Sequence, residues 1–146
     1  MLLTRRVMID RIRHHKGDKP CHLYVMTFSI DGSVLAKVGV SANPRSRVKS
    51  VQTGCPFRIM GIYSSVMRSR EVAEAAEHHA HDLLSRNNTN GEWFRFAACG
   101  VEALFAGVEK AASKFNGGPL VRLSVMSQVH WGVEDRGQSP LAGQER

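Results

Sequence analysis

The feature that most constrains the fold of this chain is an Asp31-Gly32 dipeptide between two β-rich runs. HLYVMTFSI precedes the dipeptide and SVLAKVGVS follows it. A two-residue hairpin turn needs positive φ angles, which an Asp-Gly pair adopts readily, so the pattern is a strong signal for a β-hairpin. The sequence predicts antiparallel strands over residues 22–30 and 34–40.

After the hairpin, start and stop signals predict three helices and a third strand. Asn43 and Pro44 suit the cap and first position of a short helix that ends at Gly54. Ser69 suits the cap of a longer helix, on which one apolar face is expected to hold Val72, Ala76, Ala80 and Leu83. The predicted bounds are 44–52, 70–85 and 98–115 for the helices and 57–66 for the strand, with one more short strand within 120–131.

Three strands cannot bury a core for a chain of this size, so helices must cover the sheet. We therefore expect an α+β fold in which a small three-stranded antiparallel sheet is flanked by helices. The domain is expected over residues 21–116, between a basic N-terminal leader (1–20) and a C-terminal extension (117–146) whose end is typical of disorder. The RNNTNG stretch before GEWF is interpreted as a polar loop.

The charge balance favours a polyanionic partner. The 146 residues include 20 Lys and Arg against 13 Asp and Glu, a net charge of +7 with a pI near 9.8. Such an excess favours nucleic acid, although a merely solvated basic surface has the same balance. No apolar run approaches the roughly 18–20 residues of a membrane span, and the N-terminus lacks the apolar core of a secretory signal. The 3 cysteines form no CxxC pair, so we expect reduced thiols in a cytoplasmic protein.

Several short motifs occur in an order that resembles a known nuclease family. LYVM, KVGVS, NPRSR, EHHAHDLL and GEWF follow one another over residues 22–96. Together they are similar to the GIY-YIG nuclease superfamily, in its phage and bacterial branch with KVG in place of YIG and a glutamate in GEWF. Tyr24 then takes the place of the first motif's tyrosine. The literal Gly61-Ile62-Tyr63 string is interpreted as a decoy on the third strand, because no YIG-like string follows it at the expected distance.

The resemblance implies a metal-dependent DNA endonuclease that hydrolyses phosphodiester bonds, and it assigns roles to five residues. Glu92 is the expected ligand of Mg²⁺ (or Mn²⁺), a hard cation that keeps most of its waters. Arg47 is expected to stabilise charge on the phosphate, and Tyr24 to orient or deprotonate the attacking water, with Lys37 on the adjacent strand lowering its pKa. His81 matches a histidine of this branch and is expected to assist proton transfer or touch a phosphate, with Glu77 fixing its tautomer.

The partner is expected to be DNA. A second group of cations is assigned to binding it, namely Arg45, Lys49, Arg58, Arg5 and Arg6. A single metal site cuts one strand per visit, so a homodimer is one route to cutting both strands.

Each assignment has a structural alternative. Tyr24 is also an ordinary strand aromatic, Arg47 also fits a solvated basic face, Glu92 also fits a helix cap, and His81 also fits a histidine hydrogen-bonded under the sheet. The rival functions are a non-cleaving DNA-binding module of the same fold and a protein-interaction domain whose charge serves solubility.

Overall fold

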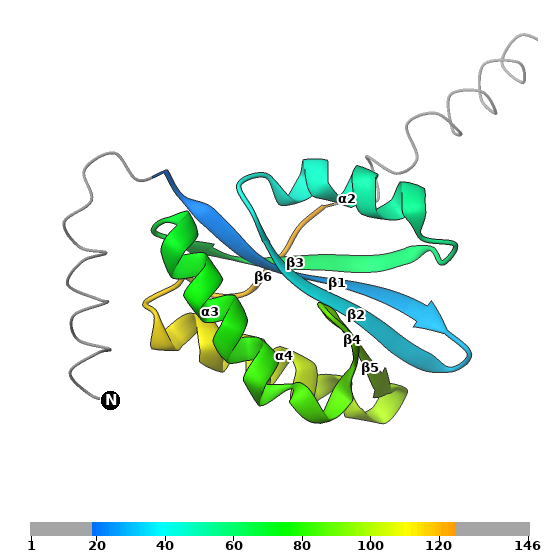
Figure 1. Cartoon of the computed structure of the whole chain (residues 1–146). Coiled ribbons are helices and arrows are strands. Elements are labelled where there is room, and N and C mark those ends of the chain that lie inside the picture. Colours follow the sequence, from blue (N-terminus) through cyan, green and yellow to red (C-terminus); the bar gives the residue numbers. More distant parts are fainter. Residues whose placement is uncertain (1–18, 125–146) are drawn as a thin grey trace, which may run out of the picture.

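The computed structural model describes residues 19–124 (Figure 1). The leader cations Arg5 and Arg6 therefore lie outside the described residues, as do residues 125–131 of the last predicted strand region. The described elements are β1 (Cys21–Ile30), β2 (Ser33–Ser41), α2 (Pro44–Gly54), β3 (Ile59–Met67), α3 (Arg70–Leu83), η1 (Ser85–Asn87), β4 (Asn88–Asn90), β5 (Trp93–Ala97), η2 (Ala98–Gly100), α4 (Val101–Lys114) and β6 (Val121–Arg122).

The predicted hairpin is confirmed. β1 and β2 pair antiparallel, and the register sets Tyr24 opposite Gly39 and Met26 opposite Lys37. The turn residues both have positive φ, 47° at Asp31 and 74° at Gly32, as a tight hairpin turn requires. This register later decides which charged side chain reaches Tyr24.

The prediction of a three-stranded sheet is wrong, although the α+β class holds. Within residues 19–124 the sheet has six strands in the order β4-β5-β2-β1-β3-β6, and every pairing is antiparallel. The RNNTNG segment, interpreted as a loop, contains β4 and turns through Gly91 (φ 54°) into β5. β4 has three residues, too few for a period of two to be visible in the sequence, whereas β6 lies within the region 120–131 where a short strand is predicted.

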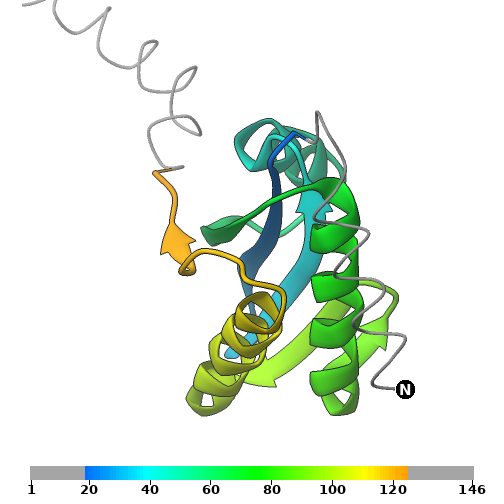
Figure 2. The same ribbon diagram turned by 90° about the vertical axis from the view of Figure 1, so that its left-hand side faces the viewer.

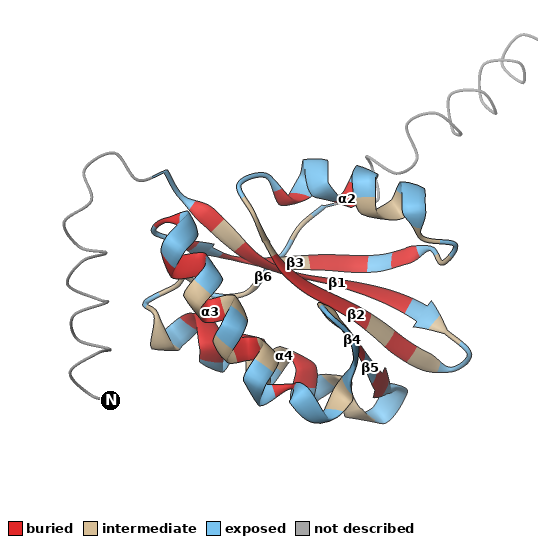
Figure 3. Cartoon of the chain, viewed as in Figure 1, coloured by how far each residue is buried: buried red, intermediate tan, exposed pale blue. Residues whose placement is uncertain are grey.

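Helices cover both faces of the sheet, but unequally. α3 and α4 lie side by side on one face and α2 lies on the other, as the two ribbon views show (Figures 1 and 2). The strands between them are largely buried, while the outward turns of the helices are exposed (Figure 3). The face under α3 and α4 carries the larger apolar cluster. The face under α2 carries a smaller apolar cluster, which includes Tyr24, Met26 and Phe28 of β1.

Local sequence signals explain where the helices start. The Asn43 side-chain oxygen accepts a hydrogen bond from the Ser46 amide at 3.1 Å, and the Ser69 hydroxyl accepts one from the Val72 amide at 3.3 Å, so both predicted caps are confirmed. The predicted apolar face of α3 needs one correction. Leu83 is 40% exposed, and its neighbour Leu84, which is the C-cap residue of the helix, is buried instead. The chain leaves helical geometry there, so the period of 3.6 no longer applies.

Among the described residues, the helices include none that is long and apolar enough to cross a membrane. Cys21 is buried, Cys55 is half-buried and Cys99 is exposed, and all three are free thiols.

Candidate functional site

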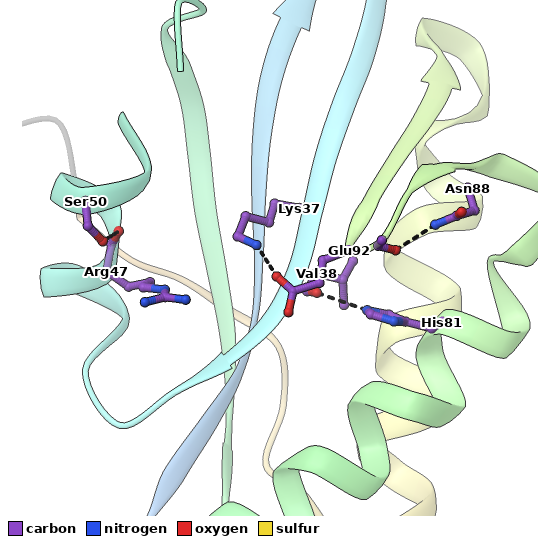
Figure 4. A network of polar contacts seen from close by, with 8 residues as sticks. Lys37, Val38, Arg47, Ser50, His81, Asn88 and Glu92 are labelled. Carbon is purple, nitrogen blue, oxygen red and sulfur yellow. Dashed lines mark hydrogen bonds and ion pairs between the residues drawn. The ribbon is translucent and has the colours of Figure 1, made fainter. Parts of the chain in front are cut away.

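Four of the predicted site residues come together beside the α2 face of the sheet. Tyr24 and Lys37 point to this face, because both alternate with residues that face the α3 and α4 side and because their strands are adjacent. Arg47 projects from the second turn of α2 toward the sheet, and Glu92 lies just before β5 (Figure 4). The hairpin, a helix and a separate short strand therefore build one cluster.

Lys37 and Glu92 form an ion pair across the β2–β5 boundary (Figure 4). The Lys37 side chain is only 10% exposed and its ammonium lies 5.5 Å from the centre of the Trp93 ring, whereas the Glu92 side chain is 42% exposed. A lysine this buried is costly unless its charge has a partner. The pair accounts for the lysine on an otherwise apolar strand and fixes the glutamate side chain at the edge of the site.

Gly39 allows the Tyr24 ring to lie across β2. A Cβ atom added at Gly39 would stand 2.6 Å from the Tyr24 hydroxyl oxygen and 2.8 Å from the ring carbon that carries it. Atoms do not approach so closely, so any side chain at this position would displace the tyrosine. The glycine of the KVG motif thus serves the placement of Tyr24, in agreement with the close backbone approach that glycine in a strand favours.

The cation that contacts Tyr24 is Arg47, and the expectation that Lys37 would lower the pKa of this phenol is wrong. Tyr24 is 1% exposed, and burial raises the pKa of its hydroxyl above the usual value, with a hydrogen bond from Arg47 and its charge acting in the opposite direction. Lys37 lies one residue pair further along the hairpin and is engaged by Glu92. Since the phenol keeps its proton at neutral pH, it is suited to hydrogen bonding rather than to removing a proton.

His81, on α3, lies beside β2 at Val38, the residue that follows Lys37. Its Nε2 is 3.0 Å from the Val38 carbonyl oxygen, and its ring packs at a tilt against Phe94 with the centroids 5.1 Å apart. A carbonyl can only accept, so Nε2 carries a proton and Val38, rather than the expected Glu77, fixes the tautomer. The Val38 amide donates to the Glu92 carbonyl at 3.0 Å. The backbone of Val38 therefore contacts both His81 and Glu92, which lie on either side of it (Figure 4).

Glu77 acts on this edge through its charge. Burial raises the pKa of its carboxyl group; His81 opposes this rise and the nearby Glu92 carboxylate adds to it. His81 is therefore hydrogen-bonded beneath the sheet through the Val38 carbonyl, which is the structural alternative stated for it above. Its charge also acts on Glu77, which lies near Glu92.

The other predicted cations that the structure describes lie exposed on α2 and in the connection that follows it. Arg45 and Lys49 are exposed on α2, four residues apart and thus on one side of the helix, and Arg58 is exposed in the connection to β3. Arg45 and Lys49 add positive charge to the helix that carries Arg47.

The Gly61-Ile62-Tyr63 string lies on β3 and serves packing, as expected for a decoy. Ile62 is buried in the apolar cluster under α2. Tyr63 points to the opposite face, where its ring meets Phe105 edge-on with a centroid distance of 4.7 Å. The two tyrosines of the chain therefore lie on opposite faces of the sheet.

Sequence reasoning missed Asn88, which belongs to the hairpin that carries Glu92. The Asn88 side-chain amide donates to the Gly91 carbonyl at 2.8 Å and to the Trp93 carbonyl at 3.2 Å, and Figure 4 shows Asn88 near Glu92. The available signal was an asparagine three residues before a glycine that must turn the chain, which is weak without knowledge that β4 is a strand.

Glu92 is the acidic side chain that best suits a cation at this site. Within the described ranges, no three His, Cys, Asp or Glu residues gather as a metal cluster. A single, partly exposed carboxylate fits Mg²⁺, which is commonly held by one or two carboxylates and retains several waters. The donor set is therefore compatible with Mg²⁺ or Mn²⁺ at Glu92.

Comparison with known proteins identifies a family. A family model described as the T5orf172 domain matches residues 21–111, which include every site residue discussed above that the structure describes. No curated protein matches the chain, and no solved structure matches it.

Proposed function

Because the chain belongs to the T5orf172 domain family, a phage-associated domain of the nuclease-related group, we propose that it is a metal-dependent endonuclease that hydrolyses phosphodiester bonds in DNA. The observation that carries the proposal is the meeting of Tyr24, Lys37, Arg47 and Glu92 at one place from separate elements. Packing alone gives no reason for two cations, a carboxylate and a phenol to gather beside an apolar cluster.

The chemistry of a phosphodiester explains why such a group is needed. The substrate is already anionic and gains charge on its oxygens as water attacks. Arg47 is exposed and offers a fork of donors to these oxygens. Tyr24 holds the guanidinium: its oxygen accepts from Arg47, which keeps the cation aimed at the site.

Glu92 is the residue proposed to hold Mg²⁺ or Mn²⁺, and Lys37 is proposed to hold Glu92. The metal, when bound, supplies Lewis-acid stabilisation of the departing oxygen. Lys37 pairs with the carboxylate from its buried side, and the exposed part of Glu92 is proposed to hold the metal. Arg45, Lys49 and Arg58 are proposed to hold the DNA backbone without reading its bases.

A non-cleaving DNA-binding module is the second candidate, and one observation favours it. Tyr24 is 1% exposed and its hydroxyl is hydrogen-bonded to Arg47, while Lys37 is paired with Glu92. The polar groups of the cluster therefore satisfy one another in the absence of substrate. Such a cluster keeps its charge for binding DNA even when it does not cut.

Nicking of supercoiled plasmid separates the two candidates. We expect nicking with Mg²⁺, none with chelator, and none with the Glu92→Gln variant. Glutamine is chosen because its amide oxygen still accepts from Lys37, whereas alanine would leave a buried lysine unpaired. Glu74→Gln, at an exposed glutamate of α3 paired loosely with Arg70, is the matched control and should cut normally. DNA binding without any nicking by the wild type would establish the binding module instead.

Arg47→Ala should lower the nicking rate by on the order of 10²–10³, the usual scale for losing one donor to a developing oxyanion. Arg45→Ala removes the same charge from the same helix two residues away and should mainly weaken DNA binding, with a shallower salt dependence. Equal losses of rate in the two variants at saturating DNA would contradict a special role for Arg47.

A further inference from the structure

Three consecutive carbonyl groups around Glu92, those of Gly91, Glu92 and Trp93, each accept a hydrogen bond from Asn88 or from β2. The Gly91 carbonyl accepts from the Asn88 side chain, the Glu92 carbonyl accepts from the Val38 amide, and the Trp93 carbonyl accepts from Asn88 again, beside a hydrogen bond from the Thr89 hydroxyl at 3.1 Å. The distances are 2.8, 3.0 and 3.2 Å. One side chain, that of Asn88, therefore brackets the glutamate on both sides.

Backbone pairing alone fixes this hairpin poorly. β4 has three residues, all exposed, and its register with β5 shifts between Asn88 and Asn90. Gly91 turns the chain with φ 54°, a conformation that allows the turn but does not enforce it. The paired residues of β2 and β5 end at Lys37 and Trp93, so Glu92 stands just past the regular ladder.

We propose that Asn88 is the positioning residue of the metal site: its amide holds the peptide groups on either side of Glu92 and so aims the carboxylate at the cation. This inference rests on the proposed function, because it assumes that Glu92 is a metal ligand. Asparagine suits the task since its NH₂ group offers two donors at one atom, one for each carbonyl. Partners that orient a metal ligand commonly matter almost as much as the ligand itself.

The neighbouring Asn87 provides a matched control. Its side-chain amide donates to the Arg95 carbonyl at 3.0 Å, so it ties the same segment to the same strand two residues further from Glu92. Asn87 and Asn88 are the same residue type, adjacent in the chain, and each donates to the backbone of β5. They differ in whether they flank Glu92.

The test is Mn²⁺ binding to the full-length protein, measured by the loss of the free-ion signal in electron paramagnetic resonance, together with thermal unfolding. Asn88→Ala should raise the Kd for Mn²⁺ by about 10- to 100-fold, the range seen when a partner of a metal ligand is removed. Asn87→Ala should leave the Kd for Mn²⁺ unchanged. Both variants should lower the melting temperature, and by similar amounts. In nicking assays Asn88→Ala should lower kcat at a fixed Mn²⁺ concentration and leave the KM for DNA unchanged.

Asn88→Ser is the second variant. It retains one hydroxyl donor and keeps the test decisive if the alanine variant does not fold; its Kd should lie between those of the wild type and Asn88→Ala.

The outcomes separate this inference from the proposed function. If the wild type binds Mn²⁺, Glu92→Gln abolishes that binding, and the folded Asn88 variants bind as tightly as the wild type, the positioning role is refuted and the nuclease proposal stands. Equal weakening in the Asn87 and Asn88 variants also refutes it, since the effect would then be general loosening of the hairpin. If the wild type and Glu92→Gln bind Mn²⁺ equally, Glu92 is not the ligand and both proposals fail.

Discussion

The two faces of the sheet differ in what they bury. The face under α3 and α4 is covered by a continuous apolar cluster in which Leu104, Val108 and several alanines are almost fully buried. The face under α2 has a shorter apolar cluster and then, on the same strands, Lys37 and the hydroxyl of Tyr24. Successive residues of β1 and β2 alternate between these two environments.

The comparison indicates that one face of the sheet provides most of the stability and the other carries the polar site. Burial of apolar area is the main favourable term in folding, and most of it lies on the face under α3 and α4. The other face can therefore hold a buried ammonium, an exposed guanidinium and a carboxylate without loss of the fold. Mutations on the two faces should accordingly separate stability from activity.

The largest effect on stability should come from the face under α3 and α4. Leu104 is fully buried, so Leu104→Ala should lower the free energy of unfolding by about 2–5 kcal/mol, from lost burial and the cavity left behind. Urea unfolding measures this loss. Nicking by the protein that remains folded should be unchanged, because α4 does not contribute to the site. Met60→Ala, at a side chain that is 47% exposed, is the control and should change stability by less than about 0.5 kcal/mol.

An intermediate effect is expected where the faces meet. Gly39→Ala places a methyl group against the Tyr24 ring and hydroxyl, so something must shift. We expect a loss of about 1–3 kcal/mol in stability, the usual range for overpacking, together with slower nicking because Tyr24 no longer holds Arg47. Gly54→Ala meets no atom within 4 Å and should cut like the wild type. Normal nicking by Gly39→Ala would show that the placement of Tyr24 is unimportant.

Much of this architecture follows from local signals in the sequence. The Asp31-Gly32 turn and the caps at Asn43 and Ser69 act through near neighbours in the sequence, and the structure has each of them as expected. The resemblance to the nuclease family, rather than a local signal, groups Tyr24, Arg47 and Glu92, and the structure brings these residues close together.

The parts that sequence reasoning missed depend on long-range pairing. β4 has three residues, too few to show alternation, and β4 and β5 are in the sheet because β2 offers β5 an edge and β5 offers one to β4. The ion pair of Lys37 with Glu92, and the Asn88 contacts beside it, follow from how β5 docks on β2. Since that docking was not predicted, Lys37 was assigned to Tyr24, its neighbour on the adjacent strand, instead of to Glu92.

The smallest effect is expected at the second tyrosine, and it tests the comparison most directly. Tyr63→Phe keeps the ring that packs edge-on against Phe105 and removes a hydroxyl from the face opposite the site. Stability should change by less than about 0.5 kcal/mol, and the nicking rate should match that of the wild type. Tyr24→Phe makes the same chemical change on the other face, where the hydroxyl accepts a hydrogen bond from Arg47, and should slow nicking clearly. The opposite result, with Tyr63→Phe inactive and Tyr24→Phe active, would mean that the first motif lies on β3 and that the site has been assigned to the wrong face of the sheet.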